Sequence, residues 1–296
     1  MKKVGWLAMF LISLMVVCNV SAETIRTTIN KRSVFQGDVL KVQLIRKSTA
    51  SFMVQFLDRK YSSVLAGKHQ TVLIGIDYQL KPGKYNLAGS YEAVPNFYLP
   101  FQYVISVKQK FPKLKYKPPK RPETEQKIIN QESGKTHAAL QRQVFKLKQL
   151  KRFVWPIKPV KINAGFGERR CRDRDRRGRG FNCRYHLGTD YRAAFDKEHS
   201  QPVTVHAINA GRVILLDNHL MDGKMLVIDH GNGISSGYLH LSKFLVREGD
   251  RVRAGQKIAI AGKTGATDAI HLHLFIKMDN GKTTVDPDKF LRMNSK

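Results

Sequence analysis

Long apolar runs are almost absent from this chain of 296 residues. The one such run, residues 4–17, is shorter than the ~20 residues needed to span a bilayer, so no transmembrane anchor is expected. It follows two lysines and precedes Val20-Ser21-Ala22, whose small side chains suit cleavage, and this pattern predicts a signal peptide over residues 1–22. The residue before Cys18 is valine, where a lipoprotein signal needs a small residue. The mature protein is therefore expected to be periplasmic or secreted, without a lipid anchor.

Cysteine is scarce, with three residues, of which only Cys171 and Cys183 follow the predicted signal peptide. Neither belongs to a Cys-x-x-Cys motif and no second pair is present, which argues against a zinc site built from thiolates. In an oxidising compartment the two could form a disulfide instead. Such a bond would close a loop just before His186 and Asp190 and shape one wall of a cleft.

Acidic residues are also few: 23 Asp and Glu stand against 52 Lys and Arg, for a formal net charge of +29. A charge of this size attracts polyanions. The arginine-rich segment 169–184 is typical of a nucleic-acid-binding arm, but no DNA- or RNA-binding fold signature accompanies it. For an exported protein we expect anionic envelope polymers as partners and no nucleic acid. A solvated basic surface that only keeps the protein soluble is the alternative.

The sequence pattern in the first half of the mature chain predicts β-strands. Turn signals at Gln36-Gly37-Asp38 and Lys81-Pro82-Gly83-Lys84 separate short β runs, and this spacing predicts a small immunoglobulin-like β-sandwich over residues 23–107. The predicted strands are residues 39–45, 52–56, 71–76 and 101–107.

The composition of residues 108–152 indicates a connector. Residues 108–122 are basic and contain proline, which favours an extended, semi-rigid segment. Pro122 is well placed near the start of a helix over residues 123–152, which could pack on either domain. Its apolar positions would be Leu140, Val144, Phe145, Leu147 and Leu150. This segment or the β domain could also cover the cleft as an inhibitory element.

The sequence pattern of residues 153–296 predicts a second, mostly β domain built on an antiparallel sheet, with glycine-rich turns between its strands. The whole chain is therefore expected to be mostly β, with two domains and a helical linker. The predicted strands of this half are residues 203–205, 211–216, 225–228, 257–261 and 271–277, with Val252 in a further one.

Two short motifs in this half carry the chemistry, H-L-G-T-D at 186–190 and H-L-H at 271–273. Side chains two apart on a strand share a face, so His271 and His273 project together. His186 and Asp190 are four apart, which also places them on one face. His186 and Asp190 from the first segment and one His from the second would together give two His and one carboxylate, the usual number of ligands for a catalytic zinc with an open fourth position.

The same ligand types describe the facial triad of non-haem iron oxygenases. However, the remaining His of H-L-H and His240 in Y-L-H-L-S are left over for proton transfer, which a hydrolase needs and an oxygenase does not. The motifs therefore favour a zinc hydrolase.

The motifs occur within an ordered series of short segments. Between about residues 155 and 291, half of the chain, this series resembles the lysostaphin/LytM-type zinc metallopeptidases, which cut peptide bonds in bacterial cell-wall peptidoglycan. The segments are G-F-G-E-R at 165–169, Y-H-L-G-T-D at 185–190, D-H-G-N-G at 229–233, Y-L-H-L-S at 238–242, G-D-R-V-R-A-G-Q at 249–256, G-K-T-G at 262–265, H-L-H at 271–273 and V-D-P at 285–287.

The resemblance implies one zinc ion held by His186, Asp190 and His273, with His240 and His271 as catalytic residues. It leaves open which of the two histidines is the general base. Ala269-Ile270 stands where Gly-Pro often precedes the H-x-H motif, and Leu274-Phe275 where Phe-Glu often follows, so the resemblance implies the metal site but not the shape of the substrate groove.

The expected activity is hydrolysis of stem peptides or cross-links of peptidoglycan, with the D-alanyl–diaminopimelate bond as the expected target. Two further hypotheses come from other classes of protein. One is a non-enzymatic regulator of other cell-wall hydrolases, and the other is a basic envelope-binding protein in which zinc is structural. The intact set of histidines argues against both.

Overall fold

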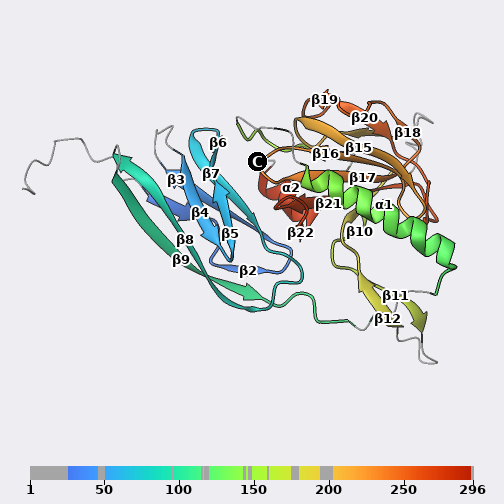
Figure 1. The fold of residues 1–296 in the computed structure, drawn as a ribbon, viewed down its shortest axis with the longest axis horizontal. Helices are drawn as coiled ribbons and strands as arrows, with labels where there is room; N and C mark the ends of the chain where they lie inside the picture. Colours follow the sequence, from blue (N-terminus) through green and yellow to red (C-terminus); the bar gives the residue numbers. More distant parts are fainter. Residues whose placement is uncertain are drawn as a thin grey trace, which may run out of the picture.

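The computed structural model describes residues 26–45, 51–94, 97–114, 116, 120–142, 145, 149–158, 160–174, 180–193 and 203–294. The predicted signal peptide at residues 1–22 lies outside these ranges. None of the described helices is long and apolar enough to cross a membrane. The described residues form twenty-two strands and two helices, which confirms the prediction of a mostly β chain (Figure 1).

The amino-terminal part consists of two sheets that pack against each other. Their shared core contains Val42 and Ile74 from the first sheet and Val54 and Leu87 from the second, all with no exposed surface. The first sheet has the strand order β1 (Arg26–Ile29), β3 (Val39–Ile45), β7 (His69–Gly75) and β6 (Val64–Ala66). The second has the order β2 (Ser33–Phe35), β9 (Phe97–Lys108), β8 (Gly83–Val94), β4 (Phe52–Phe56) and β5 (Arg59–Ser62).

Two of these strands begin and end where the sequence predicts, β3 and β4. In β4 buried and exposed residues alternate strictly, so the pattern that predicts the strand is also the pattern of its packing. The prediction missed β8, because Lys81-Pro82-Gly83-Lys84 indicates a turn and the strand begins within it, at Gly83. The immunoglobulin-like topology and the boundary at residue 107 stay predictions.

The connector leads to α1 (Glu123–Gln141), which begins after Pro122 as expected. The prediction that this helix continues to residue 152 was wrong. The helix ends at Gln141, and Leu150 instead donates a backbone hydrogen bond to the carbonyl oxygen of Leu65 in β6. Val144 and Leu147, two of its predicted apolar positions, lie outside the described residues.

The carboxy-terminal part is built on an eight-stranded antiparallel sheet. A three-stranded sheet of β14 (Thr204–His206), β20 (Lys257–Ile260) and β18 (Lys243–Phe244), a hairpin of β11 (Arg169–Arg174) and β12 (Gly180–Tyr185), and the short helix α2 (Pro287–Asn294) complete it. The order in the large sheet is β10 (Ile162–Ala164), β13 (Thr189–Arg192), β21 (His271–Met278), β17 (Ser235–Leu241), β16 (Gly223–Asp229), β15 (Gly211–His219) and β19 (Arg251–Val252), with β22 (Thr283–Val285) paired to β21.

The two faces of this sheet have different roles. In β21, Leu272, Leu274 and Ile276 have no exposed surface and belong to the main core, which α2 also joins. The alternate residues His271, His273 and Phe275 point to the opposite face. There Phe275 packs with residues of β15, β16 and β17 and with the carboxyl end of α1. Figure 1 shows α1 lying along the sheet. The helix thus covers one end of the face on which the two histidines lie.

Candidate metal centre

Neighbouring strands bring Asp190 and His273 together. Asp190 on β13 lies directly opposite His273 on β21, and the next even position pairs Arg192 with His271. His186 is not on a strand, contrary to one reading of its spacing from Asp190, but in the loop that leads into β13. Its backbone N–H bonds to the Glu168 carbonyl oxygen, and its ring Nδ1 donates to the carbonyl oxygen of Gly165 at 3.0 Å.

Three ligand atoms converge at this point. His186 Nε2 lies 3.0 Å from His273 Nδ1 and 3.1 Å from Asp190 Oδ1, and the last two atoms are 2.8 Å apart. Ligands of a tetrahedral zinc ion, each about 2.0–2.2 Å from the metal, are separated by roughly 3.4 Å. The triangle therefore already has nearly the size of one face of such a site.

The protonation states also suit a cation. Because the proton of His186 is placed on Nδ1 by its bond to Gly165, its Nε2 presents a lone pair, and only one proton, on His273 Nδ1, remains for three facing atoms. Burial alone would raise the pKa of Asp190, but the adjacent imidazoles of His186 and His273 hold that pKa well below its ordinary value. Burial lowers the pKa of His273. A carboxylate and neutral imidazoles are the forms that bind zinc, so this donor set fits the ion.

The second carboxylate oxygen of Asp190 has a partner of its own. Arg170, on β11, places a guanidinium nitrogen 2.5 Å from Asp190 Oδ2, and the carboxylate is only 9% exposed. A charge-assisted bond of this kind fixes the plane of the carboxylate and leaves Oδ1 directed at the two histidines. Sequence reasoning missed Arg170, because nothing distinguishes it from the other arginines of its segment.

His240 lies in a distorted part of β17. The pairing of β16 with β17 shifts register between Lys224 and Leu226, and His240 has a φ of +60°, which non-glycine residues rarely adopt. Its Nδ1 donates to the carbonyl oxygen of Thr264 at 2.9 Å. Burial lowers the pKa of His240. This strain turns the ring toward the other histidines, with its centroid 4.8 Å from that of His271.

His271 is held in a similar way. Its Nδ1 lies 2.9 Å from the carbonyl oxygen of Ala269 and 3.2 Å from Thr267 Oγ1. Its Nε2 is 3.6 Å from Asp190 Oδ1, close to the candidate ligand triangle. In both His240 and His271 a backbone carbonyl oxygen therefore holds the Nδ1 proton, and Nε2 is left with a lone pair.

A glycine makes room for one ligand. A Cβ atom built on Gly188 would lie 2.3 Å from His273 Nε2 and 2.6 Å from the carbonyl oxygen of Leu274. The glycine in H-L-G-T-D is thus required by the close approach of the loop to the facing strand, whatever the chemistry of the site.

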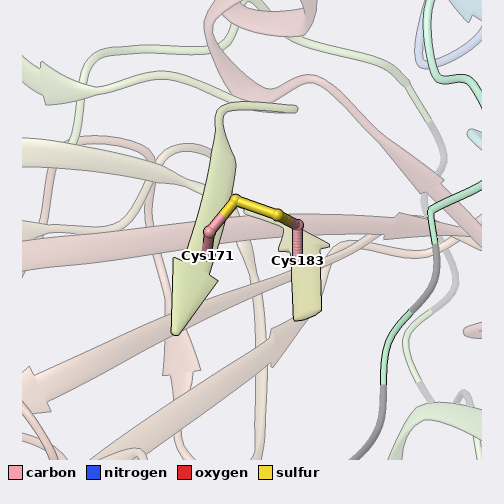
Figure 2. Close-up of a disulfide and its surroundings, with 2 residues drawn as sticks. All are labelled: Cys171 and Cys183. Carbon is pink, nitrogen blue, oxygen red and sulfur yellow. A yellow bond between two sulfur atoms is a disulfide. The ribbon is translucent and has the colours of Figure 1, made fainter. Parts of the chain in front are cut away.

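The Cys171–Cys183 disulfide is present, and it joins directly paired residues of β11 and β12 whose Cα atoms are 4.0 Å apart (Figure 2). The prediction placed it across a loop, whereas the structure places it across a two-stranded hairpin. Arg170 precedes Cys171 on β11, so the bond ties the strand that carries the Asp190 partner to its neighbour.

A cleft of about 940 Å³ opens beside the candidate ligands. It borders His186, His240 and His273 on one side, and Cys183 lies in its wall. Its volume is within the usual range for sites that bind small molecules and peptides. The structure therefore brings all five predicted chemical residues together, and three of them, His186, His240 and His273, border one cleft.

Comparison with known proteins shows that this part of the chain is similar to a peptidase family. Residues 184–287 match the model of Peptidase family M23. The peptidoglycan DD-endopeptidase ShyB of Vibrio cholerae is 38% identical over 95 residues, which are 32% of this chain and 21% of that protein. The lipoprotein NlpD of Yersinia enterocolitica is 40% identical over 29% of this chain and 88% of its own sequence. The chain thus spans about a fifth of the length of the Vibrio relative.

One solved structure resembles nearly the whole chain. A crystal structure from Pseudomonas aeruginosa, described as a peptidase M23, superposes with a TM-score of 0.64 over 90% of this chain and 97% of that one. At 22% identity this similarity supports the fold, including the arrangement of an amino-terminal part with the carboxy-terminal one.

Proposed function

Because this chain belongs to peptidase family M23, we propose that it is an exported zinc metalloendopeptidase that hydrolyses peptide bonds of peptidoglycan. The observation that carries the proposal is the convergence of His186 Nε2, Asp190 Oδ1 and His273 Nδ1 within 3.1 Å of one another, beside two further imidazoles. His186, Asp190 and His273 would hold one zinc ion. When bound, the ion supplies Lewis acidity and lowers the pKa of a coordinated water to about 7.

The two remaining histidines suit proton transfer. Because carbonyl oxygens of Thr264 and Ala269 hold the Nδ1 protons, the Nε2 atoms of His240 and His271 are free to accept a proton from an attacking water. The lowered pKa of His240 keeps its ring neutral at working pH, as a base requires. Once protonated, either imidazole can stabilise negative charge that develops on the scissile carbonyl oxygen or return the proton to the leaving amine.

We propose the D-alanyl–diaminopimelate cross-link as the bond that is cut. The similarity to a peptidoglycan DD-endopeptidase supports this choice, and so does the predicted export through a signal peptide at residues 1–22. The proposed organisation is a positional or wall-binding β domain at residues 23–107, a connector at 108–152 and the peptidase domain at 153–296, acting in the periplasm or outside the cell.

The test is digestion of purified cross-linked peptidoglycan by the zinc-loaded mature protein, with mass spectrometry of the released fragments. Loss of cross-linked dimers is expected, and a chelator should abolish it. His240→Ala and His271→Ala should each lower the rate by about a hundredfold or more, because each removes a proton-transfer group. His137→Ala, on the exposed face of α1, is the matched control and should leave the rate unchanged.

A protein that binds zinc and yet leaves every cross-link intact would refute the enzymatic proposal. That result would favour the non-enzymatic regulator of other wall hydrolases, which can be checked by adding the protein to an assay of a purified amidase. Cleavage that survives both histidine substitutions would instead show that the proposed catalytic residues are wrong.

A further inference from the structure

The cleft beside the candidate metal ligands has two unlike walls. One wall belongs to the carboxy-terminal part and includes Met221, Leu239 and Ala266. A second wall is assembled from three segments that are far apart in sequence: the turn around Tyr78–Pro82 of the β-sandwich, residues 109 and 111–114 of the connector, and Arg184–Tyr185 of the hairpin. The amino-terminal part thus reaches the site where the chemistry is expected.

The connector is fastened in place along this wall. Phe111 is 7% exposed, and its ring centroid lies 5.1 Å from that of Tyr185 and 5.6 Å from that of Phe166. Its backbone N–H donates to Gln36 Oε1 of the β-sandwich at 2.9 Å, and Tyr185 donates to the carbonyl oxygen of Pro112 at 2.6 Å. These contacts hold the connector against both the β-sandwich and the carboxy-terminal part, beside the cleft of about 940 Å³.

This composite wall is positively charged. Lys81 comes from the β-sandwich, Lys113 from the connector and Arg184 from the hairpin, and all three are exposed. Within the described part of the chain none of the three has a carboxylate partner, whereas Arg170 is paired with Asp190. Among the described residues that border the cleft, Asp222 is the one with an acidic side chain. Three separate segments thus contribute three available cations to one side of the cleft.

We infer that this wall binds the free carboxylates of an anionic peptide, and that the β-sandwich and the connector are part of the substrate-binding site. Cations that border a cleft concentrate ligands of opposite charge and orient them. The inference rests on the proposed function for the identity of the occupant, a stem peptide of peptidoglycan. A peptide laid between this wall and His240 would have its carboxylates at Lys81, Lys113 and Arg184 and its backbone at the candidate metal ligands.

Binding can be measured apart from cleavage. The probe is a fluorescein-labelled L-Ala–D-Glu–meso-diaminopimelate–D-Ala peptide, which carries free carboxylates but no cross-link, and its partner is the same peptide with every carboxylate converted to a carboxamide. The full mature protein should bind the acid form about tenfold more tightly than the amide form at low salt. At 1 M salt, where the Debye length is about 3 Å, this preference should disappear.

Substitutions identify the cations responsible. Lys81→Gln, Lys113→Gln and Arg184→Gln should each reduce the preference for the acid peptide by about two- to fivefold, in the range of single exposed ion pairs. The triple variant should bind the two peptides alike, and its thermal unfolding should match that of the wild-type protein. Lys84→Gln is the matched control, since Lys84 is exposed on β8 but does not border the cleft.

The inference is overturned if the wild-type protein binds the two peptides equally, or if the triple variant keeps the preference. Tight binding of heparin without a preference between the peptides would also overturn it and would indicate a non-peptide polyanion. The result is distinct from that of the digestion assay. If the protein prefers the acid peptide but cleaves no cross-links, only the proposal of an enzymatic activity is refuted. If it cleaves cross-links without this preference, only the inference of a carboxylate-binding wall is refuted.

Discussion

Backbone carbonyl oxygens orient three of the four histidines in the candidate centre. Gly165 holds His186, Thr264 holds His240 and Ala269 holds His271, each through Nδ1. This arrangement fixes the ring tautomer without a side-chain acceptor, because the acceptor is the main chain. It also explains why the sequence cannot name these partners: any residue type provides a carbonyl oxygen.

The first prediction concerns the partner of Asp190. Arg170→Gln removes a charge-assisted bond that holds the carboxylate plane, and it should weaken zinc binding by about 10- to 100-fold, the usual effect of losing such a supporting contact. The measurement is competition with a chromophoric chelator. Arg184→Gln, on the same hairpin, should leave zinc affinity unchanged; an equal loss in both variants would mean that general charge, and not the bond to Asp190, is responsible.

The second prediction concerns the contact between Gly188 and His273. Gly188→Ala forces a methyl group against the imidazole and the Leu274 carbonyl oxygen, so His273 must move and zinc affinity should fall by at least about tenfold. Overpacking should also cost about 1–3 kcal/mol of folding stability. Gly165→Ala is the control, because the space around Gly165 is open. If titration shows that the Gly188→Ala variant binds zinc with the affinity of the wild-type protein, the prediction is wrong.

Strands rich in apolar and β-branched residues were predictable, including the largely buried β7 and β16, whereas a buried strand that begins with small and polar residues was not. The alternation in β3 and β4 is visible in the sequence because one face of each is solvated. In β17 all seven residues are buried, including serines and a glycine, because partners cover the strand on both faces and both edges. Nothing in Ser235-Ser236-Gly237 predicts this, so the strand that carries His240 was missed.

The helix prediction failed for a related reason. Apolar residues beyond Gln141 continue the pattern of α1, but Leu150 is used in a backbone hydrogen bond beside β6 and in the main core. The same apolar residues can pack as one face of a longer helix or as an extended segment beside β6, and contact with the β-sandwich decides between these two structures. The helix itself buries only Ala139 and Leu140.

The third prediction concerns pH and the turn between β16 and β17. His230 is fully enclosed there, with Nδ1 at 2.9 Å from the Ala210 carbonyl oxygen and Nε2 at 2.7 Å from Ser236 Oγ. Burial lowers its pKa to about 4. Because the unfolded chain takes up this proton near pH 6.5 and the folded chain only near pH 4, stability is complete above pH 6.5 and is lost progressively as the pH falls toward 4.

This loss amounts to about 3 kcal/mol in the folding free energy, as an order of magnitude. His230→Gln cannot titrate, so denaturant unfolding should show a shallower decline between pH 7 and pH 4 than for the wild-type protein. His137→Gln, in the exposed part of α1, should keep the wild-type slope. A variant of His230 with the full wild-type decline would show that other groups account for the acid instability.

The two β-rich parts of the molecule are joined by polar contacts as well as by the connector. Arg59 donates to Asp279 at 2.6 Å and to Thr283 at 2.7 Å, and the backbone N–H of Thr284 donates to Asp77 at 2.8 Å. Lys289 of α2 pairs with Asp38 of the β-sandwich. Contacts of this kind fix orientation, which the charged wall of the cleft requires.

The fourth prediction tests this junction. Arg59→Gln leaves the carboxylate of Asp279, only 8% exposed, without its cation, and should lower stability by about 1–3 kcal/mol. Calorimetry should show the change in the transition of the β-sandwich. Lys60→Gln, exposed on the same strand, is the matched control. If the two variants unfold alike, the ion pair does not fasten the β-sandwich to its neighbour.

The sequence by itself determined the chemistry: which residues can hold a metal, that they stand two and four positions apart, and that the chain is mostly β. These properties depend on residue type and short-range spacing, which the chain carries locally. Only the tertiary structure decided that Arg170 meets Asp190, that a bulge turns His240 inward, and that the β-sandwich and connector border the cleft. Each of these contacts joins segments far apart in sequence, and its position is set by packing that no local pattern records.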